Sequence, residues 1–338
     1  MEQNRGLPQE EPNLGTIAQL NFSMAGTRVL ATAVQLGIFS AIASGKATSP
    51  EIAKAGSASE RGVRMLLDAL AAFGLVTKQG NRYGLPAASA QYLVRESPDY
   101  MGFMLERDFL WDSWGRLTEV VRSGKPVHAV EQQDKAEEFF SVLVRSLHVM
   151  NREPARRMAA VLGAEAKALE VLDVGCGSGV WSIAVAEANP KTCVTAQDFP
   201  AVLEITRQYA RRHGVEERFD YLAGDLKRAE FGEGRFDLAV LGNICHTEGE
   251  QSTRSLFARL SRALRPGGRI AVIDMLPNEE RTGPVYPLIF ALNMLLHSEH
   301  GGTYTLSEYT QWLKQAGFAR IETADIGLHS PLIVGYKD

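Results

Sequence analysis

The sequence has few cysteines, no long apolar run and no excess of one charge sign. Its 338 residues include three cysteines, Cys176, Cys193 and Cys245, and none forms a C-x-x-C pair. A disulfide framework or a zinc cluster is therefore not expected, and a reducing, cytoplasmic compartment fits this content. The 36 basic and 40 acidic residues give a net charge of −4, which favours neither nucleic acid nor an anionic membrane as a partner.

No segment is expected to span a membrane. The longest apolar stretches, 29–43 and 285–296, are shorter than a span requires and are interrupted by Gln35 and Asn293. The N-terminal residues are polar and acidic and show no apolar signal segment. We therefore expect both apolar stretches to form core or interface helices.

The chain is long enough for about two domains. Residues 1–14 are rich in Gln, Glu, Asn and Pro and predict a flexible arm. In residues 15–98, Thr48-Ser49-Pro50-Glu51 is a helix start, and two short strands flank Gln79-Gly80-Asn81. Three short helices and a β-hairpin predict a winged helix. Because no basic stripe is present, a role in dimerisation or as a lid is favoured, and DNA binding is not.

Residues 99–165 predict a helical linker or substrate-lid region that contains many aromatic residues. Aromatic residues that are spaced along helices in this way more often belong to a core than to a substrate pocket. The position of this region between two domains nevertheless makes Phe103, Trp111 and His148 candidates for substrate contact.

Residues 166–338 alternate between strand and helix patterns, and this predicts a parallel, doubly wound, Rossmann-like α/β sheet. The five expected parallel strands are 169–174, 192–197, 219–223, 236–241 and 269–274. Helices are expected between them, for example at 180–187 and 250–264. Two late strands, 320–325 and 332–336, are joined by a turn with Gly and Pro, so an antiparallel pair should complete a seven-stranded sheet.

A glycine-rich loop, Asp173–Gly179, follows the first strand of this sheet. Its glycines allow a ligand to approach the backbone, and the helix after it presents N–H groups. The spacing is G-x-G-x-G rather than G-x-G-x-x-G, which favours S-adenosylmethionine over a dinucleotide. We expect Asp173, Gly175, Gly177 and Gly179 to contact this cofactor.

Acidic residues or glycines end the other predicted strands as well. Asp198 ends the second strand, where a carboxylate can accept both hydroxyl protons of a ribose. Asp225 ends the third strand, placed to meet an adenine amino group. The fourth strand ends in 242–246 and the fifth in Asp274. Each carboxylate alone could also be a cap or a solvated loop end.

These motifs resemble class I S-adenosylmethionine-dependent methyltransferases. The matching segments are 173–179, Asp198-Phe199-Pro200, Gly224-Asp225-Leu226 and 264–270. The winged-helix region and Ile244-Cys245-His246 narrow the resemblance to the small-molecule O-methyltransferases, which include plant caffeic-acid, animal hydroxyindole and bacterial natural-product enzymes. The resemblance covers residues 17–336.

The resemblance implies S-adenosylmethionine as cofactor, S-adenosylhomocysteine as product, a small-molecule acceptor and a homodimer formed through the N-terminal domain. Phe199, Leu226 and Asn243 become further cofactor contacts, and Asn293 and His297 further substrate contacts.

In the same family, the histidine that matches His246 is the general base, and the acid that matches Asp274 orients it. A hydroxyl is a poor nucleophile until it is deprotonated, and an imidazole exchanges a proton near neutral pH. The chain departs from the family at two places: Thr247-Glu248 stands for Asp-Trp, and Thr303-Tyr304 stands where a second orienting glutamate is usual.

Three alternatives remain open. No metal is the first expectation, but α-keto-acid C-methyltransferases of this family bind a metal through histidines that match His246 and His297. His297 and His300 would share one face if their segment is helical. The protein could also bind S-adenosylmethionine without transferring methyl, for example to cyclise it. It could instead be a DNA-binding regulator that senses the cofactor.

Overall fold

The computed structural model describes residues 11–106, 108–127 and 133–338. The chain divides into two compact units, with the boundary between Asp112 and Ser113. Most of the expected arm, residues 1–10, lies outside the described residues. No helix of the described ranges is long and apolar enough to cross a membrane.

The N-terminal unit is mainly helical and carries a small β-hairpin. Its elements are α1 (Leu14–Phe22), α2 (Met24–Gln35), α3 (Ile38–Ala43), α4 (Ser49–Ala55), α5 (Glu60–Ala72), β1 (Thr77–Gln79), β2 (Arg82–Gly84), α6 (Ala87–Tyr92) and the 3-10 helix η1 (Gly102–Leu105). Thr48 and Glu51 form a capping box at α4, and Ser59 caps α5. Ile38, Ile52 and Leu67 are buried in its core. The predicted helical domain with a β-wing is confirmed.

Helix α7 (Phe109–Gly115) crosses the boundary between the units. The C-terminal unit continues with α8 (Leu117–Ser123), α9 (Gln133–Val161), β3 (Glu170–Val174), α10 (Val180–Ala188), β4 (Cys193–Asp198), α11 (Pro200–Arg212), η2 (Glu216–Arg218), β5 (Phe219–Ala223), β6 (Phe236–Gly242), α12 (Cys245–Ala263), β7 (Leu264–Ile273), α13 (Val285–His297), α14 (Leu306–Gln315), β8 (Phe318–Ala324) and β9 (Leu332–Lys337).

The C-terminal unit is built on one sheet of seven strands in the order β5-β4-β3-β6-β7-β9-β8. Strands β3 to β7 are parallel, and β9 pairs antiparallel with both β7 and β8. This confirms the predicted Rossmann-like sheet with its antiparallel end. The chain order reverses between β3 and β6, and such a switch point is where open α/β sheets bind ligands.

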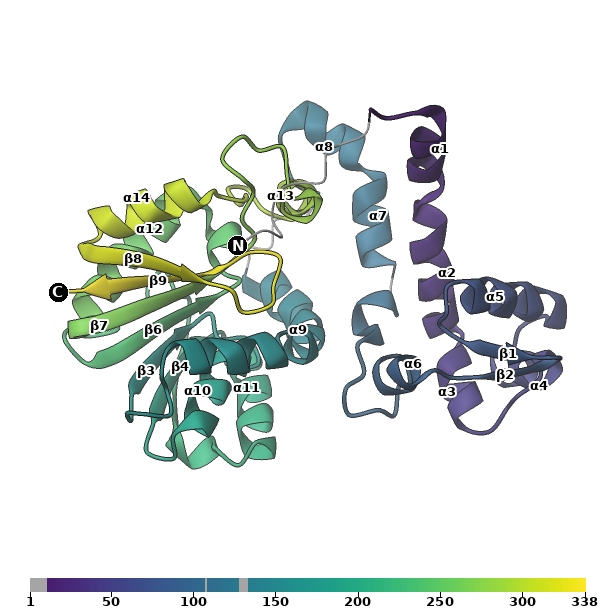
Figure 1. Ribbon diagram of the computed structural model, residues 1–338, viewed down its shortest axis with the longest axis horizontal. Coiled ribbons are helices and arrows are strands. Elements are labelled where there is room, and N and C mark those ends of the chain that lie inside the picture. The colour runs from purple at the N-terminus through teal and green to yellow at the C-terminus, as the bar shows by residue number, and fades with distance from the viewer. Residues whose placement is uncertain (1–10, 107, 128–132) are drawn as a thin grey trace. The chain divides into compact units, whose positions relative to one another are not determined.

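Helices cover both faces of this sheet (Figure 1), and alternate strand residues point to opposite faces. Val171 joins the core on the side of α9, α10 and α11, whereas Leu172 joins the core on the side of α12 and α14. Both faces of the parallel strands are therefore apolar, which leaves the strand ends as the place for polar chemistry.

Three local expectations differ from the structure. Helix α12 begins at Cys245, ahead of the expected residue 250, and Gly249 (φ 79°) kinks it. Strand β7 begins at Leu264 rather than at 269. Helix α13 ends at His297 because Ser298 is extended, with φ −140° and ψ 144°. The condition for a shared helical face of His297 and His300 is therefore not met: His297 is buried and His300 is exposed.

Candidate functional site

The glycine loop after β3 has a backbone that side chains would obstruct. Gly175, Gly177 and Gly179 have φ values of 61°, 57° and 72°. A Cβ atom at Gly175 would lie 2.9 Å from Cγ1 of Ile244, and one at Gly179 would lie 2.9 Å from Cγ2 of Thr206. The loop therefore requires glycine for its conformation and its packing.

Strand β4 holds this loop from the side. The N–H of Gly177 donates to Oδ2 of Asp198 (2.9 Å), and the N–H of Cys176 donates to the Gln197 carbonyl (3.0 Å). The Gln197 side chain accepts from the Gly175 N–H (3.3 Å) and donates to the Gly224 carbonyl (2.6 Å). Gln197 thus links the ends of β3 and β5. Sequence reasoning missed it, although it precedes Asp198.

Asp173 lies beneath the loop and is fully buried. Its Oδ2 accepts from the Ser182 hydroxyl (2.5 Å), and its Oδ1 has no hydrogen-bond partner within the described ranges. Burial is the main cause that raises the pKa of Asp173, to about 7, and the nearby Asp198 carboxylate adds to the rise. The site therefore contains an acceptor oxygen that no described residue satisfies.

The loop after β5 is fixed by α12. Oδ1 of Asp225 accepts from the Lys227 N–H (2.9 Å) and forms a turn. Arg259 donates to the carbonyls of Leu226 (2.8 Å) and Ala229. Asp225 and Leu226 are each half-buried. Nothing local in the sequence connects Arg259 to this loop, because the contact is made only in the fold.

Asn243 follows β6 directly and has a left-handed backbone with φ 60°. Its N–H donates to the Ile273 carbonyl (2.8 Å), while its Oδ1 is buried and lacks a partner in the described part of the chain. Phe199 precedes α11 and packs with Val144, Val202 and Ile205. The predicted cofactor residues thus gather at the ends of β3, β4, β5 and β6.

His246 and Asp274 form a buried pair at the ends of β6 and β7. Nδ1 of His246 lies 2.5 Å from Oδ1 of Asp274, and the His246 N–H donates to Oδ2 (3.0 Å). An ionised carboxylate can only accept, so this contact assigns the proton to Nδ1 and makes Nε2 the basic nitrogen. The sequence predicted this pair, and the structure brings the two residues together.

Asp274 is fully buried yet remains ionised. Burial alone would raise its pKa, but the charge and hydrogen bonds of His246, with those from Tyr309 and the Met275 N–H, outweigh burial and lower the pKa below its usual value. The Tyr309 hydroxyl donates to Oδ2 (2.8 Å), and the Met275 N–H donates to Oδ1 (2.8 Å).

A loop between α13 and α14 holds His246 from behind. The N–H of Gly302 donates to the His246 carbonyl (2.8 Å), and a Cβ at Gly301 would lie 2.6 Å from that oxygen. The hydroxyl of Ser298 accepts from the Gly301 N–H (2.7 Å) and contacts the Thr247 carbonyl (3.3 Å). The glycine pair therefore supports His246 through its backbone. Sequence reasoning missed this contact.

Aromatic side chains of α13 line the same region. The ring of Phe290 meets the His246 imidazole edge-on, with 4.8 Å between centroids, and Tyr286 stacks on Phe290 at 6.2 Å. Asn293 is half-buried on the same helix, and His297 is buried at its end. The predicted contacts Asn293 and His297 thus come from the helix that packs against His246.

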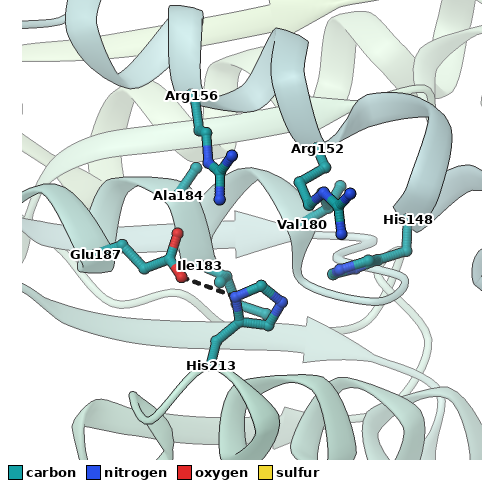
Figure 2. A pocket seen from close by; sticks show the side chains of 8 residues that line it. All are labelled: His148, Arg152, Arg156, Val180, Ile183, Ala184, Glu187 and His213. Atoms are coloured by element: carbon teal, nitrogen blue, oxygen red, sulfur yellow. Dashed lines mark hydrogen bonds and ion pairs between the residues drawn. The ribbon is translucent and has the colours of Figure 1, made fainter. Parts of the chain in front are cut away.

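His148 lies beside the glycine loop, on α9. Its Nδ1 is 3.0 Å from the Ser178 hydroxyl, and its ring stacks on Tyr209 at 3.7 Å. It borders a small pocket (Figure 2), in which His213 pairs with Glu187 at 2.7 Å. The same pocket is lined by Arg152, Arg156, Val180, Ile183 and Ala184.

The other two predicted substrate contacts belong to the N-terminal unit. Phe103 lies in η1 and packs edge-on against Tyr100, with 4.9 Å between centroids. Trp111 is 39% exposed, and Arg28 lies 5.4 Å from its ring centroid. Within the described residues, no group of three or more His, Cys, Asp or Glu side chains could hold a metal ion.

The strand order, the glycine loop after β3 and the carboxylates after β4 and β5 define a class I S-adenosylmethionine-dependent methyltransferase fold. S-adenosylmethionine fits this site. Oδ1 of Asp173 offers a buried acceptor that has no partner among the described residues, and Oδ1 of Asn243 offers a second.

Comparison with known families identifies the chain more closely. Residues 124–319 match the model of the O-methyltransferase domain, and residues 18–95 match the O-methyltransferase dimerisation domain. The chain belongs to this O-methyltransferase family, as the sequence motifs predicted. It is an enzyme that transfers a methyl group from S-adenosylmethionine to oxygen.

Individual relatives agree over nearly the whole chain. A 3-hydroxy-5-methyl-1-naphthoate 3-O-methyltransferase of Streptomyces sahachiroi is 30% identical over 88% of this chain and 87% of its own length. The tetracenomycin polyketide synthesis 8-O-methyltransferase of Streptomyces glaucescens is 29% identical over 96% of each. The crystal structure of a Nostoc punctiforme protein described as an O-methyltransferase is 29% identical, with a TM-score of 0.85, and covers 97% of this chain and 100% of its own.

Proposed function

We propose that this enzyme methylates a hydroxyl group of a small, natural-product-type molecule and that His246 is the general base. The observation that carries this proposal is the buried His246–Asp274 pair. Because Asp274 holds the proton on Nδ1, Nε2 is the nitrogen that takes the hydroxyl proton. The attacking oxygen gains nucleophilicity as the proton leaves, and Asp274 stabilises the imidazolium that forms.

The cofactor residues follow from the strand ends. Asp173 and the glycine loop would hold the amino acid part of S-adenosylmethionine. Oδ1 of Asp173, which no described residue contacts by a hydrogen bond, can accept from an ammonium group. Asp198 would accept from the ribose hydroxyls, and Asp225 with Leu226 would meet the adenine. Asn243 and Phe199 complete this set. When bound, the cofactor supplies an electrophilic methyl group.

The acceptor class is supported by the relatives. One Streptomyces relative is named for transfer to the 3-oxygen of a hydroxynaphthoate, and the other is named as an 8-O-methyltransferase of tetracenomycin polyketide synthesis. Phe290 and Tyr286 beside His246 suit a flat aromatic acceptor of this kind. We include Asn293 and His297 as contacts to its polar groups. Metal-assisted C-methylation through His246 and His297, and chemistry without methyl transfer, are less well supported by these relatives.

The assembly that we propose is a homodimer through the N-terminal unit. Residues 18–95 match a dimerisation domain, and α1 exposes large apolar side chains. These are Leu14, Ile17, Leu20 and Phe22. Light scattering should give about twice the chain mass of 37.0 kDa, and a mass near 37.0 kDa would reject the dimer. A cytoplasmic location and the absence of a nucleic-acid partner stay predictions.

The first experiment incubates the protein with S-adenosylmethionine and a panel of hydroxynaphthoates, other phenols and α-keto acids, with products identified by mass spectrometry. We expect methyl ethers of the phenols. A C-methylated keto acid, or conversion of the cofactor without an acceptor, would contradict the proposal.

The second experiment replaces the base. His246→Ala should lower kcat by roughly 10²–10⁴-fold, because an unassisted hydroxyl attacks slowly. The affinity of the His246→Ala variant for S-adenosylmethionine, measured by titration calorimetry, should stay unchanged. The matched control is His213→Ala, which removes a histidine from another histidine–carboxylate pair of the same unit. A loss of less than threefold in His246→Ala would remove this residue from the mechanism.

A further inference from the structure

We propose that Tyr309 is a positioning residue of the methyl transfer: its hydroxyl fixes Asp274, and Asp274 in turn fixes the base His246. This inference rests on the proposed function of His246. The contact is the 2.8 Å hydrogen bond from the Tyr309 hydroxyl to Oδ2 of Asp274, made between α14 and the end of β7. Neither residue is exposed.

Tyr309 supplies the fourth hydrogen bond to the Asp274 carboxylate. Oδ1 of Asp274 accepts from the His246 ring and the Met275 N–H, and Oδ2 accepts from the His246 N–H and the Tyr309 hydroxyl. Each oxygen therefore has two donors, and the plane of the carboxylate is fixed relative to the imidazole. Without Tyr309, Oδ2 would keep only one donor, in a place without solvent.

The surroundings of Tyr309 hold its ring rigidly. A capping box between Thr305 and Glu308 starts α14, and Arg281 pairs with Glu308 at 2.7 Å. The ring packs edge-on against Trp312 and Tyr304, at 5.5 and 6.0 Å between centroids. Burial raises the pKa of Tyr309 well above its usual value, so its hydroxyl stays protonated and donates at every working pH.

Asp274 is the carboxylate that holds the base among the described residues, because it accepts from both the ring and the N–H of His246. A hydrogen bond that fixes Asp274 therefore also fixes the imidazole. We infer that Tyr309 orients the base through this one carboxylate.

The test is Tyr309→Phe, which keeps the ring and removes only the hydroxyl. We expect kcat to fall roughly 10-fold, because a hydrogen bond to a buried charge is lost. The KM for the acceptor and the affinity for S-adenosylmethionine should change less than twofold. The acid limb of the kcat–pH profile should move to higher pH, because the His246–Asp274 pair holds its proton more tightly when the carboxylate loses a donor.

The matched control is Tyr83→Phe, which removes a tyrosine hydroxyl that donates to Asp68 in the N-terminal unit, and it should leave kcat and the profile unchanged. Rates are expressed per cofactor-binding site, so that loss of folded protein is not counted as loss of catalysis. An unchanged kcat, or a lower kcat with an unmoved acid limb, would overturn the proposal. If His246→Ala were also fully active, the proposed function would fail as well; normal activity of Tyr309→Phe alone would refute only the role of Tyr309.

Discussion

The two halves of the site each contain a fully buried aspartate, and the two behave in opposite ways. Asp173 lies one residue before the end of β3 in the cofactor half, and Asp274 follows β7 in the catalytic half. Burial raises the pKa of Asp173 to about 7, whereas the pKa of Asp274 is lowered despite equal burial. Burial raises the pKa of Asp173, whereas at Asp274 the charge and hydrogen bonds of its neighbours outweigh burial.

The number of donors explains the difference. Asp173 accepts described hydrogen bonds from Ser182 alone, and its Oδ1 accepts none from the described residues. Asp274 accepts four, two of them from His246. In the catalytic half, described residues donate to both oxygens of Asp274, so we call this half complete. In the cofactor half, Oδ1 of Asp173 receives no donor from the described residues and can accept from a cationic ligand, so we call this half incomplete. A base must be oriented before substrate arrives, whereas a binding residue gains its donor on binding.

The largest expected effect on activity comes from replacing Asp274 in the complete, catalytic half. Asp274→Asn offers one carbonyl oxygen where four donors converge, and its amide group would face a donor. We expect kcat to fall by roughly 10²-fold or more, with little change in the affinity for S-adenosylmethionine. Steady-state kinetics and titration calorimetry measure the two quantities. If kcat stayed within threefold of wild type, Asp274 would have no part in orienting the base.

A smaller effect is expected in the incomplete half. Asp173→Asn should weaken S-adenosylmethionine binding by roughly 10- to 100-fold at pH 8, because a charge-assisted hydrogen bond is lost. Wild-type affinity should decrease as the pH falls from 8 to 6, since a carboxyl with a pKa of about 7 must lose its proton to accept from a cation. The variant should lack this component of the pH dependence.

Calorimetry in two buffers with different heats of ionisation provides the check on Asp173. Wild-type binding near pH 7 should release more protons to the buffer than binding by Asp173→Asn. Equal proton release by the two proteins would show that Asp173 is not the group that titrates on binding.

The comparison also explains what the sequence could predict. The glycine loop, Asp198 and Asp225 lie at the ends of strands or just beyond them, and parallel strands bring their ends to one edge of the sheet. A local motif and a strand pattern therefore place the cofactor half. The pair of His246 and Asp274 followed from the same argument together with the family resemblance.

The supporting contacts could not be predicted, because they join segments that no local pattern connects. Tyr309 reaches Asp274 from α14, and Arg259 reaches the β5 loop from α12. The end of α13 needed no such contact, because the apolar stretch 285–296 predicted it to within one residue of His297.

The smallest expected effect concerns stability without cofactor. A folded carboxyl with a raised pKa binds protons that the unfolded chain does not, so its contribution is fully present below the unfolded value of 3.8 and is lost as the pH rises through about 7. Between pH 6 and 8 Asp173 should lower the free energy of unfolding by about 1.4 kcal/mol. Asp274 has the opposite sign: its contribution is lost only in acid, below its unfolded pKa, and is constant in this range.

Urea titrations of the full chain at pH 6, 7 and 8 can isolate the contribution of Asp173 to the free energy of unfolding. The difference in unfolding free energy between Asp173→Asn and wild type should grow by about 1.4 kcal/mol from pH 6 to pH 8, because every other titrating group cancels in the difference. Asp274→Asn should show a constant difference over the same range. If the Asp173→Asn difference were also constant, the two buried carboxylates would share one charge state, and the contrast between a complete and an incomplete half would not hold.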